Sequence, residues 1–216
     1  MTTVGILGGT GPAGRGVAIR LASAGYDVLL GSRDEARAES VATTLLARGS
    51  GVVRGATNEA AAGCELVIVA TPWDSAVATV RALREALADK VVVSMVNALA
   101  REGKEVVPLY PPRGSMAAQL AHALPASRVV GAFHHLPAGA MEDLDSGLEA
   151  DVAVVGDDDG ARESVVAMID AMPGLRAVVV GSLSLASAVE AFTAVCVSIN
   201  IRHRAHSYVT FAGLRD

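Results

Sequence analysis

Residues 3–14 of the sequence read TVGILGGTGPAG, an apolar run that leads directly into a glycine-rich turn. Gly9, Gly11 and Gly14 form a G-x-G-x-x-G pattern, after which apolar residues recur at helical spacing until Gly25. Such a pattern is weak when it stands alone, but here it follows a predicted strand and opens a predicted helix. The stretch therefore predicts the first strand, turn and helix of a dinucleotide-binding βαβ unit.

Each glycine of the pattern has its own physical task in such a turn. Gly9 permits the tight turn, Gly11 lets the backbone approach a diphosphate, and Gly14 allows close contact between helix and strand. The free N–H groups at the start of the helix then bind the anion. The alternative is a glycine turn with a structural role only. The predicted diphosphate site comprises Gly9, Thr10, Gly11, Pro12, Ala13 and Gly14.

Strand and helix patterns alternate along the rest of the chain. Strands are expected over residues 27–30, 51–56, 66–70, 91–94, 128–133, 151–155 and 177–180, and helices over 34–48, 58–63, 74–87, 116–124, 160–172 and 187–204. Residues 99–115 contain three prolines and two glycines, so an irregular loop is expected there. This alternation predicts an α/β fold, a Rossmann-type doubly wound and mainly parallel sheet with a small C-terminal α/β extension.

Composition narrows the choice of compartment and partner. A net charge of −5 argues against nucleic acid as a partner, because binding to its phosphates requires clustered excess Lys and Arg. Cys64 and Cys196 form no C-x-x-C pair and are expected to be buried thiols. We see no signal-peptide pattern and no apolar run as long as a membrane span. A cytoplasmic protein with small-molecule partners, and no membrane, is the expectation.

The end of the second predicted strand indicates which dinucleotide binds. NAD-binding chains usually place Asp or Glu there, whereas this chain has Ser32 followed by Arg33, with Arg37 one helical turn further on. A hydroxyl and guanidinium groups donate charge-assisted hydrogen bonds to a 2′-phosphate, which a carboxylate would repel. Asp34 and Glu35 are read as first-turn helix acids on the solvent face. The pattern favours NADP, and the alternative is that both arginines are solvated surface charges.

Further motifs are distributed over nearly the whole chain. They are Gly8-Gly9-Thr10-Gly11, Gly31-Ser32-Arg33, Thr71-Pro72-Trp73, Val93-Ser94 with Val96-Asn97, Gly131-Ala132-Phe133-His134-His135, Gly156-Asp157-Asp158 and Val189-Glu190-Ala191-Phe192-Thr193. In the order and spacing of these motifs the sequence resembles the NADPH:coenzyme F420 oxidoreductases, also called F420-dependent NADP reductases. The resemblance implies reversible hydride transfer between NADP(H) and the deazaflavin ring of coenzyme F420.

The resemblance also implies roles for individual residues. Thr10, Ser32, Arg33 and Arg37 match the 2′-phosphate binders, Thr71 belongs to the NADP site, Pro72, Asn97 and Ala132 match neighbours of the nicotinamide, and His134 and Thr193 match deazaflavin-side positions. Residues 1–136 are then the NADP(H)-binding Rossmann domain, and residues 137–216 a smaller C-terminal subdomain packed on it to form the acceptor cleft. Because hydride passes directly between two carbons, no catalytic acid or base and no metal are expected.

Several histidines and arginines have two interpretations. His134 hydrogen-bonds or packs against the acceptor ring, or it is an ordinary strand-end histidine; a metal role for it lacks companion ligands at suitable spacing. Arg202 and Arg204, together with His203 and His206, either hold the phosphate or glutamate tail of the deazaflavin or form a solvated helix end.

One segment departs from the family pattern. Relatives usually carry Asn and an Arg or another polar residue just before the Val-Glu pair, where this chain has Ser184 to Ala188 without them. The departure leaves two other functions open: an NADPH-dependent reductase of a flavin or of ferric iron, and a non-catalytic NADP(H)-binding regulator. The family is usually dimeric or larger, and the apolar final helix is a candidate to cover either the interface of a homodimer or the cleft.

Overall fold

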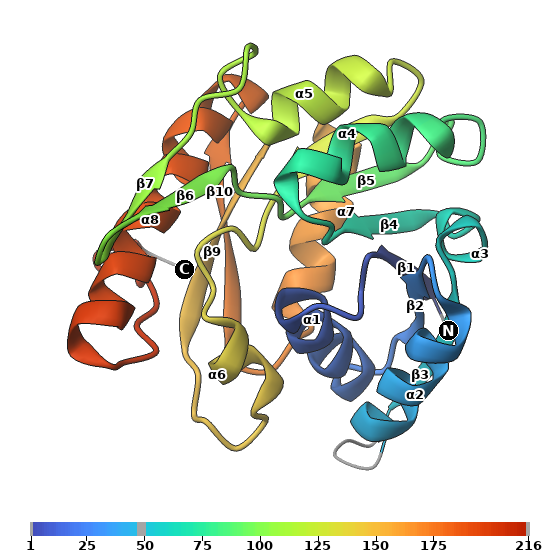
Figure 1. Ribbon diagram of the computed structural model, residues 1–216, viewed down its shortest axis with the longest axis horizontal. Helices are drawn as coiled ribbons and strands as arrows, with labels where there is room; N and C mark the ends of the chain where they lie inside the picture. Colours follow the sequence, from blue (N-terminus) through green and yellow to red (C-terminus); the bar gives the residue numbers. More distant parts are fainter. Residues whose placement is uncertain (1, 47–50, 215–216) are drawn as a thin grey trace.

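The computed structural model describes residues 2–46 and 51–214. Eight strands form one sheet in the order β10-β9-β8-β5-β4-β1-β2-β3 (Figure 1). The strands are β1 (Thr3–Leu7), β2 (Asp27–Ser32), β3 (Val52–Thr57), β4 (Leu66–Val69), β5 (Val91–Ser94), β8 (Arg128–Gly131), β9 (Ala150–Gly156) and β10 (Leu175–Gly181). Neighbours run parallel except for β8 and β9, so the predicted mainly parallel α/β sheet is confirmed.

Helices cover both faces of this sheet. They are α1 (Pro12–Ser23), α2 (Glu35–Leu46), α3 (Asn58–Ala62), α4 (Trp73–Ala82), α5 (Met116–Ala123), α6 (Ala138–Glu142), α7 (Asp159–Asp170) and α8 (Ala186–His203), with a 3₁₀ turn, η1 (Leu183–Leu185). One buried apolar cluster joins α1, α2, α6 and α7 to the sheet, and a second joins α3, α4 and α5 to the sheet. Strands β1, β4 and β5 supply side chains to both clusters, as expected for strands buried on both faces.

Residues 137–216 continue the sheet of the first half. They add β9 and β10, with α7 packed on these strands, and the helices α6 and α8. The proposed boundary between residues 136 and 137 thus falls within a connection between two neighbouring strands of one sheet. The division into two domains stays a prediction.

Residues 99–115 were predicted to form an irregular loop, and this prediction is wrong for residues 99–108. Strands β6 (Leu99–Glu102) and β7 (Glu105–Pro108) pair as an antiparallel hairpin, whose turn contains Gly103 at φ +61°. Pro108 is compatible with this because it occupies the last position of a two-stranded sheet, where its missing N–H costs little. Helix α6 was also missed by the sequence patterns. Both elements flank the site described below (Figure 1).

The prediction that no apolar stretch is as long as a membrane span was wrong, because one helix has the length and the composition of such a span. The helical segment Leu183–His203 is long and apolar enough to cross a membrane. Of its most apolar 18-residue stretch, 28% is buried inside the protein. A single helix of this kind is weak evidence for a span, and its polar Glu190 and Thr193 are buried against the rest of the protein. Of the two cysteines, Cys196 is buried as expected, whereas Cys64 is only half-buried.

Candidate functional site

The glycine turn between β1 and α1 has the tight packing that its sequence predicts. A Cβ at Gly14 would lie 2.6 Å from the carbonyl oxygen of Gly9, so a side chain there would force the helix away from the turn. A Cβ at Gly11 would meet nothing closer than 3.9 Å, which leaves its backbone open to a ligand. The left-handed backbone of the turn lies one residue before the pattern, at Gly8, where φ is +67°.

A cavity of about 420 Å³, here called the turn cavity, lies over this turn. Nine of the predicted NADP-binding residues line it: Thr10, Gly11, Pro12, Ala13, Ser32, Arg33, Arg37, Thr71 and Pro72. Gly9 and Gly14 do not line the turn cavity, and their close approach to each other shapes the turn. Sequence reasoning missed Asn58, Ser75 and Thr79 in the lining. Asn58 holds the turn directly, since its Oδ1 accepts a hydrogen bond of 3.1 Å from the Gly8 N–H.

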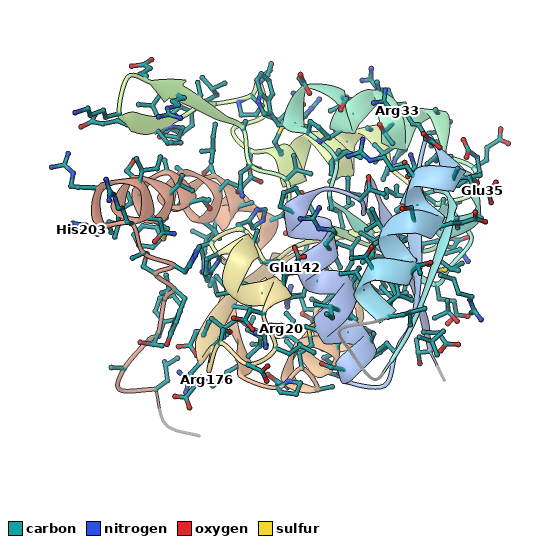
Figure 2. The ribbon with its side chains drawn as sticks, turned by 60° about the horizontal axis from the view of Figure 1, so that its bottom comes forward. Arg20, Arg33, Glu35, Glu142, Arg176 and His203 are labelled. Atoms are coloured by element: carbon teal, nitrogen blue, oxygen red, sulfur yellow. The ribbon has the colours of Figure 1, made fainter. Side chains whose placement is uncertain are left out.

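The basic end of the turn cavity begins where β2 ends. Ser32 is buried, and its Oγ accepts a hydrogen bond from the Asp34 N–H at 3.1 Å, which fixes the hydroxyl at the start of α2. Asp34 in turn accepts from the Arg37 N–H, so it caps the helix as a first-turn acid. The guanidinium groups of Arg33 and Arg37 are exposed and have no ion-pair partner among the described residues (Figure 2 labels Arg33). Two exposed guanidinium groups and a hydroxyl therefore line this end of the turn cavity.

A second cavity of about 300 Å³, here called the inner cavity, is adjacent to the turn cavity, since Ala13 lines both. Its wall comprises Ala13, Val17, Met95, Asn97, Leu99, Phe133, His134, His135, Leu136, Pro137, Ala138, Met141, Thr193, Cys196, Val197, Asn200 and His206. The predicted residues Asn97, His134 and Thr193 are thus brought together. Ala132 lines neither cavity, because it is fully buried and its N–H donates to the Ser94 carbonyl. Its predicted contact with the nicotinamide is not supported by this placement.

Asn97, His134 and Thr193 form one hydrogen-bond network at the floor of the inner cavity. The Asn97 Nδ2 donates to the His134 carbonyl at 2.9 Å, and its Oδ1 lies 3.0 Å from the His134 Nδ1. The Thr193 hydroxyl donates to the same carbonyl at 3.1 Å. With Oδ1 as the acceptor, the neutral imidazole carries its proton on Nδ1. The side chain of Asn97 is therefore held in one orientation at the cavity.

The His134 imidazole belongs to the protein interior. It is 3% exposed, and burial, reinforced by the neighbouring His135, lowers its pKa to about 3. His135 is also buried, and its Nε2 accepts a hydrogen bond from the Ala153 N–H at 3.3 Å. Both rings are thus neutral at ordinary pH and suited to holding neighbours in place. No group of three or more His, Cys, Asp or Glu side chains within the described ranges could hold a metal ion.

Glu190 is a buried carboxylate whose role the sequence did not reveal. Its two oxygens accept hydrogen bonds from the first two N–H groups of α5, from Met116 at 2.7 Å and from Ala117 at 2.9 Å. Burial raises the pKa of Glu190 to about 7, although both N–H donors favour its charged form. Since Thr193 lies one helical turn further on, this contact ties α8 to α5 beside the network.

Helix α6 forms one wall of the inner cavity, and arginines of α1 hold it there. The buried guanidinium of Arg20 donates to the carbonyl oxygens of Ala140, Met141, Asp143 and Pro173, at distances from 2.8 to 3.0 Å, and to the Ser146 hydroxyl at 3.2 Å. Arg15, at the surface, forms an ion pair of 3.1 Å with Glu142. Figure 2 shows Arg20 and Glu142 between α1 and α6.

The basic residues at the end of α8 lie apart from the cavity wall. Arg202 is exposed and pairs with Glu105 of the hairpin at 3.7 Å, and Arg204 adopts a left-handed backbone at the helix end. Neither lines the inner cavity, whereas His206, two residues beyond Arg204, does. The same cavity has no lining residue from the departing segment 184–188. In Figure 2, the labelled His203 and Arg33 lie at opposite sides of the molecule.

Comparisons with known proteins are consistent with this geometry. Residues 3–98 match the family model described as NADP oxidoreductase, coenzyme F420-dependent. The F420-dependent NADP reductase of Methanocaldococcus jannaschii is 33% identical over 93% of this chain and 93% of its own length. That of Methanothermobacter marburgensis is 32% identical over 98% of this chain and 96% of its length. A crystal structure from Arthrobacter sp. FB24, provisionally named an F420-dependent NADP reductase, matches 96% of this chain and 97% of its own, with 25% identity and a TM-score of 0.81.

Proposed function

This chain belongs to the family of F420-dependent NADP reductases, and we propose that it transfers hydride directly between NADP(H) and coenzyme F420. The reaction is NADPH + F420 + H⁺ ⇌ NADP⁺ + reduced F420. Two electrons move as one hydride from a carbon of one ring to a carbon of the other, and the proton comes from solvent. The nicotinamide and the deazaflavin supply the redox chemistry when bound.

One observation carries the proposal: two cavities of different chemistry are adjacent, with Ala13 in the lining of both. The turn cavity combines open backbone at a helix start with the exposed guanidiniums of Arg33 and Arg37, which form no ion pair within residues 2–46 and 51–214 and suit a diphosphate and a 2′-phosphate. The inner cavity is mainly apolar, with the fixed amide of Asn97 at its floor, which suits flat rings stacked out of water. A dinucleotide that spans both cavities places its nicotinamide in the inner one, beside the space left for an acceptor ring.

The residues of the inner cavity bind, orient and exclude water. Asn97 presents its remaining amide N–H, and its orientation is set by His134 and Thr193. Apolar side chains such as Met95, Phe133 and Val197 keep water from the place where the two rings meet. The rate then depends on near-contact alignment of two carbons, which a rigid, dry cavity provides without an acid or a base.

The arrangement supports two further parts of the proposal. Residues 137–216 act as the acceptor-side subdomain, because they supply α6, α8 and most of the far wall of the inner cavity. A homodimer is proposed from the face of α8 that carries Phe192, Val195 and Ile199, each between 42% and 48% exposed, and a cytoplasmic location is proposed separately. Sedimentation analysis tests the dimer: twice the monomer mass is expected, and a monomer at micromolar concentration contradicts it.

Acceptor specificity tests the function. NADPH is mixed separately with F420, with a flavin and with a ferric chelate, and consumption of NADPH and acceptor are followed together. We expect equimolar loss of NADPH and of the F420 absorbance, with slow or no turnover of the other two acceptors. Faster reduction of flavin or iron would select a different reductase. Tight NADPH binding without any turnover would select a non-catalytic regulator.

A further inference from the structure

The chain reverses direction after α8, and Asn200 builds this reversal. Its carbonyl accepts the Ala205 N–H at 3.2 Å, and its Oδ1 accepts both the N–H and the hydroxyl of Ser207 at 2.7 Å. The left-handed backbone of Arg204, at φ +51°, completes the turn. Residues 205–214, here called the C-terminal strap, therefore return over the protein instead of extending the helix.

The far end of the strap is clamped to β9 through Asp151. The Asp151 N–H donates to the Val209 carbonyl at 2.8 Å, and its carboxylate accepts the Phe211 N–H. Arg176 of β10 holds the same carboxylate through two hydrogen bonds of 2.7 and 2.8 Å, and also donates to the Phe211 carbonyl at 3.3 Å. The strap is thus fixed on both sides of His206 by side chains of the folded core.

The two attachments place the His206 ring against α6 at the wall of the inner cavity. A Cβ built at Gly139 would lie 3.0 Å from the His206 Cε1 and 3.4 Å from its Nδ1. These distances mean that the imidazole packs directly over the backbone of Gly139, in space that any side chain would occupy. Gly139 therefore acts as the seat of the ring.

Hydrogen-bond donors dominate this end of the cavity. The Asn200 Oδ1 is fully engaged with Ser207, so its Nδ2 is the group that remains for a ligand. The His206 imidazole lines the same cavity, and none of the lining residues in the described part of the chain is Asp or Glu. Arg204 adds a positive charge two residues before His206. Neighbouring donors without a carboxylate suit an oxygen-rich, anionic group.

We propose that His206, seated on Gly139 by the clamped strap, and the amide of Asn200 bind the acidic side chain of the acceptor where it leaves the inner cavity. This inference rests on the proposed function and specifies which residues recognise the acceptor beyond its ring. It makes the strap a specificity element, built by Asn200 at one end and Asp151 at the other. The hydride-transferring rings themselves lie deeper, towards Asn97.

Steady-state kinetics of three variants tests the proposal, with F420 and with the same deazaflavin lacking its phosphate-containing side chain. His206→Ala removes the donor, Gly139→Ala displaces the ring, and Asn200→Asp keeps an oxygen for Ser207 but replaces the amide N–H₂ with a negative charge. Each is expected to raise the KM for F420 about fivefold to tenfold. The KM for NADPH and the KM for the shortened acceptor should change less than about twofold.

The exposed His122 on α5 lines neither cavity, and His122→Ala is the matched control, expected to leave all three KM values unchanged. Thermal melting checks that the variants fold. An unchanged KM for F420 in His206→Ala overturns the inference while the proposed function stands. An equal rise for both acceptors also overturns it, since the contact would then be with the ring. Absence of F420 reduction by the wild-type protein overturns both proposals and is seen before any variant is made.

Discussion

The amide oxygen of Asn97 lies 3.0 Å from Nδ1 of His134, although the two residues are 37 positions apart and leave the ends of neighbouring strands. This contact indicates that the buried His134 positions the side chain of Asn97. Since His134 is neutral and its ring is out of solvent, we expect it to act on bound ligands through Asn97 and not by proton transfer.

This positioning role predicts a selective loss of rate. In His134→Ala, Asn97 loses a partner and its orientation is no longer fixed, so kcat should fall about tenfold or more while the KM for NADPH changes little. In His134→Asn, the shorter amide restores a donor near the Nδ1 position, and most of kcat should return. Equal losses of kcat in both variants would contradict the positioning role.

Arg33 is predicted to select the phosphorylated dinucleotide. Arg33→Ala removes a charge-assisted contact of about 1.5 to 3 kcal/mol, which should raise the KM for NADPH roughly tenfold to a hundredfold. The KM for NADH should hardly change, because NADH has no 2′-phosphate. Arg84→Ala, on the exposed surface after α4, is the control. Equal effects of Arg33→Ala on both dinucleotides would contradict the assignment.

The two arginines that link α1 to α6 should differ strongly in their effect on stability. Arg20→Met leaves several buried carbonyl oxygens without a donor and should lower the free energy of unfolding by about 3 kcal/mol or more. Arg15→Met removes an ion pair at the surface and should cost less than about 1 kcal/mol. Urea unfolding measures both. A similar loss in the free energy of unfolding for both variants would show that Arg20 is not the main link between α1 and α6.

Glu190 should make stability depend on pH. Burial raises its pKa from 4.5 to about 7, so between these values the folded protein holds a proton that the unfolded chain releases. The contribution of this group is therefore greatest below pH 4.5 and is lost as the pH rises through about 7. Glu190→Gln removes this dependence.

We accordingly expect Glu190→Gln to cost more stability at pH 5 than at pH 8, by about 1 to 3 kcal/mol in urea unfolding. The exposed Glu163→Gln is the control and should show no such difference. A cost that is larger at pH 8 would mean that the two N–H groups of α5 keep the carboxylate charged despite its burial.

The order of elements around the glycine turn was predictable because the signals are local. Residues 3–25 combine an apolar run, three glycines at fixed spacing and a helical repeat, and each of these signals involves only residues close together in the sequence. The turn cavity followed from the same logic, since parallel strands bring their carboxyl ends to one edge. Ser32 and Thr71 follow neighbouring parts of that edge and do line it.

The inner cavity could be predicted only in part, because its far wall depends on contacts between distant segments. His206 reaches it through a chain reversal at Asn200 and a clamp at Asp151, and neither leaves a periodic pattern. The hairpin β6–β7 was not predicted because Pro108 lies in it and two further prolines follow it. It packs on α8 through contacts such as the hydrogen bond from the Val106 N–H to the Ser198 hydroxyl. Ala132, directly after β8, is fully buried, whereas Phe133, with a left-handed backbone at φ +65°, lines the inner cavity, so the nicotinamide contact of Ala132 stays a prediction.

Isotope transfer tests direct hydride transfer most plainly. NADPH carrying deuterium at C4 of the nicotinamide, prepared separately for each face of the ring, is oxidised with F420 in ordinary water, and the reduced deazaflavin is examined by mass spectrometry. The account predicts that one of the two labelled forms passes its deuterium to the deazaflavin carbon with no loss to solvent. A product that takes this hydrogen from water with both labelled forms would contradict it.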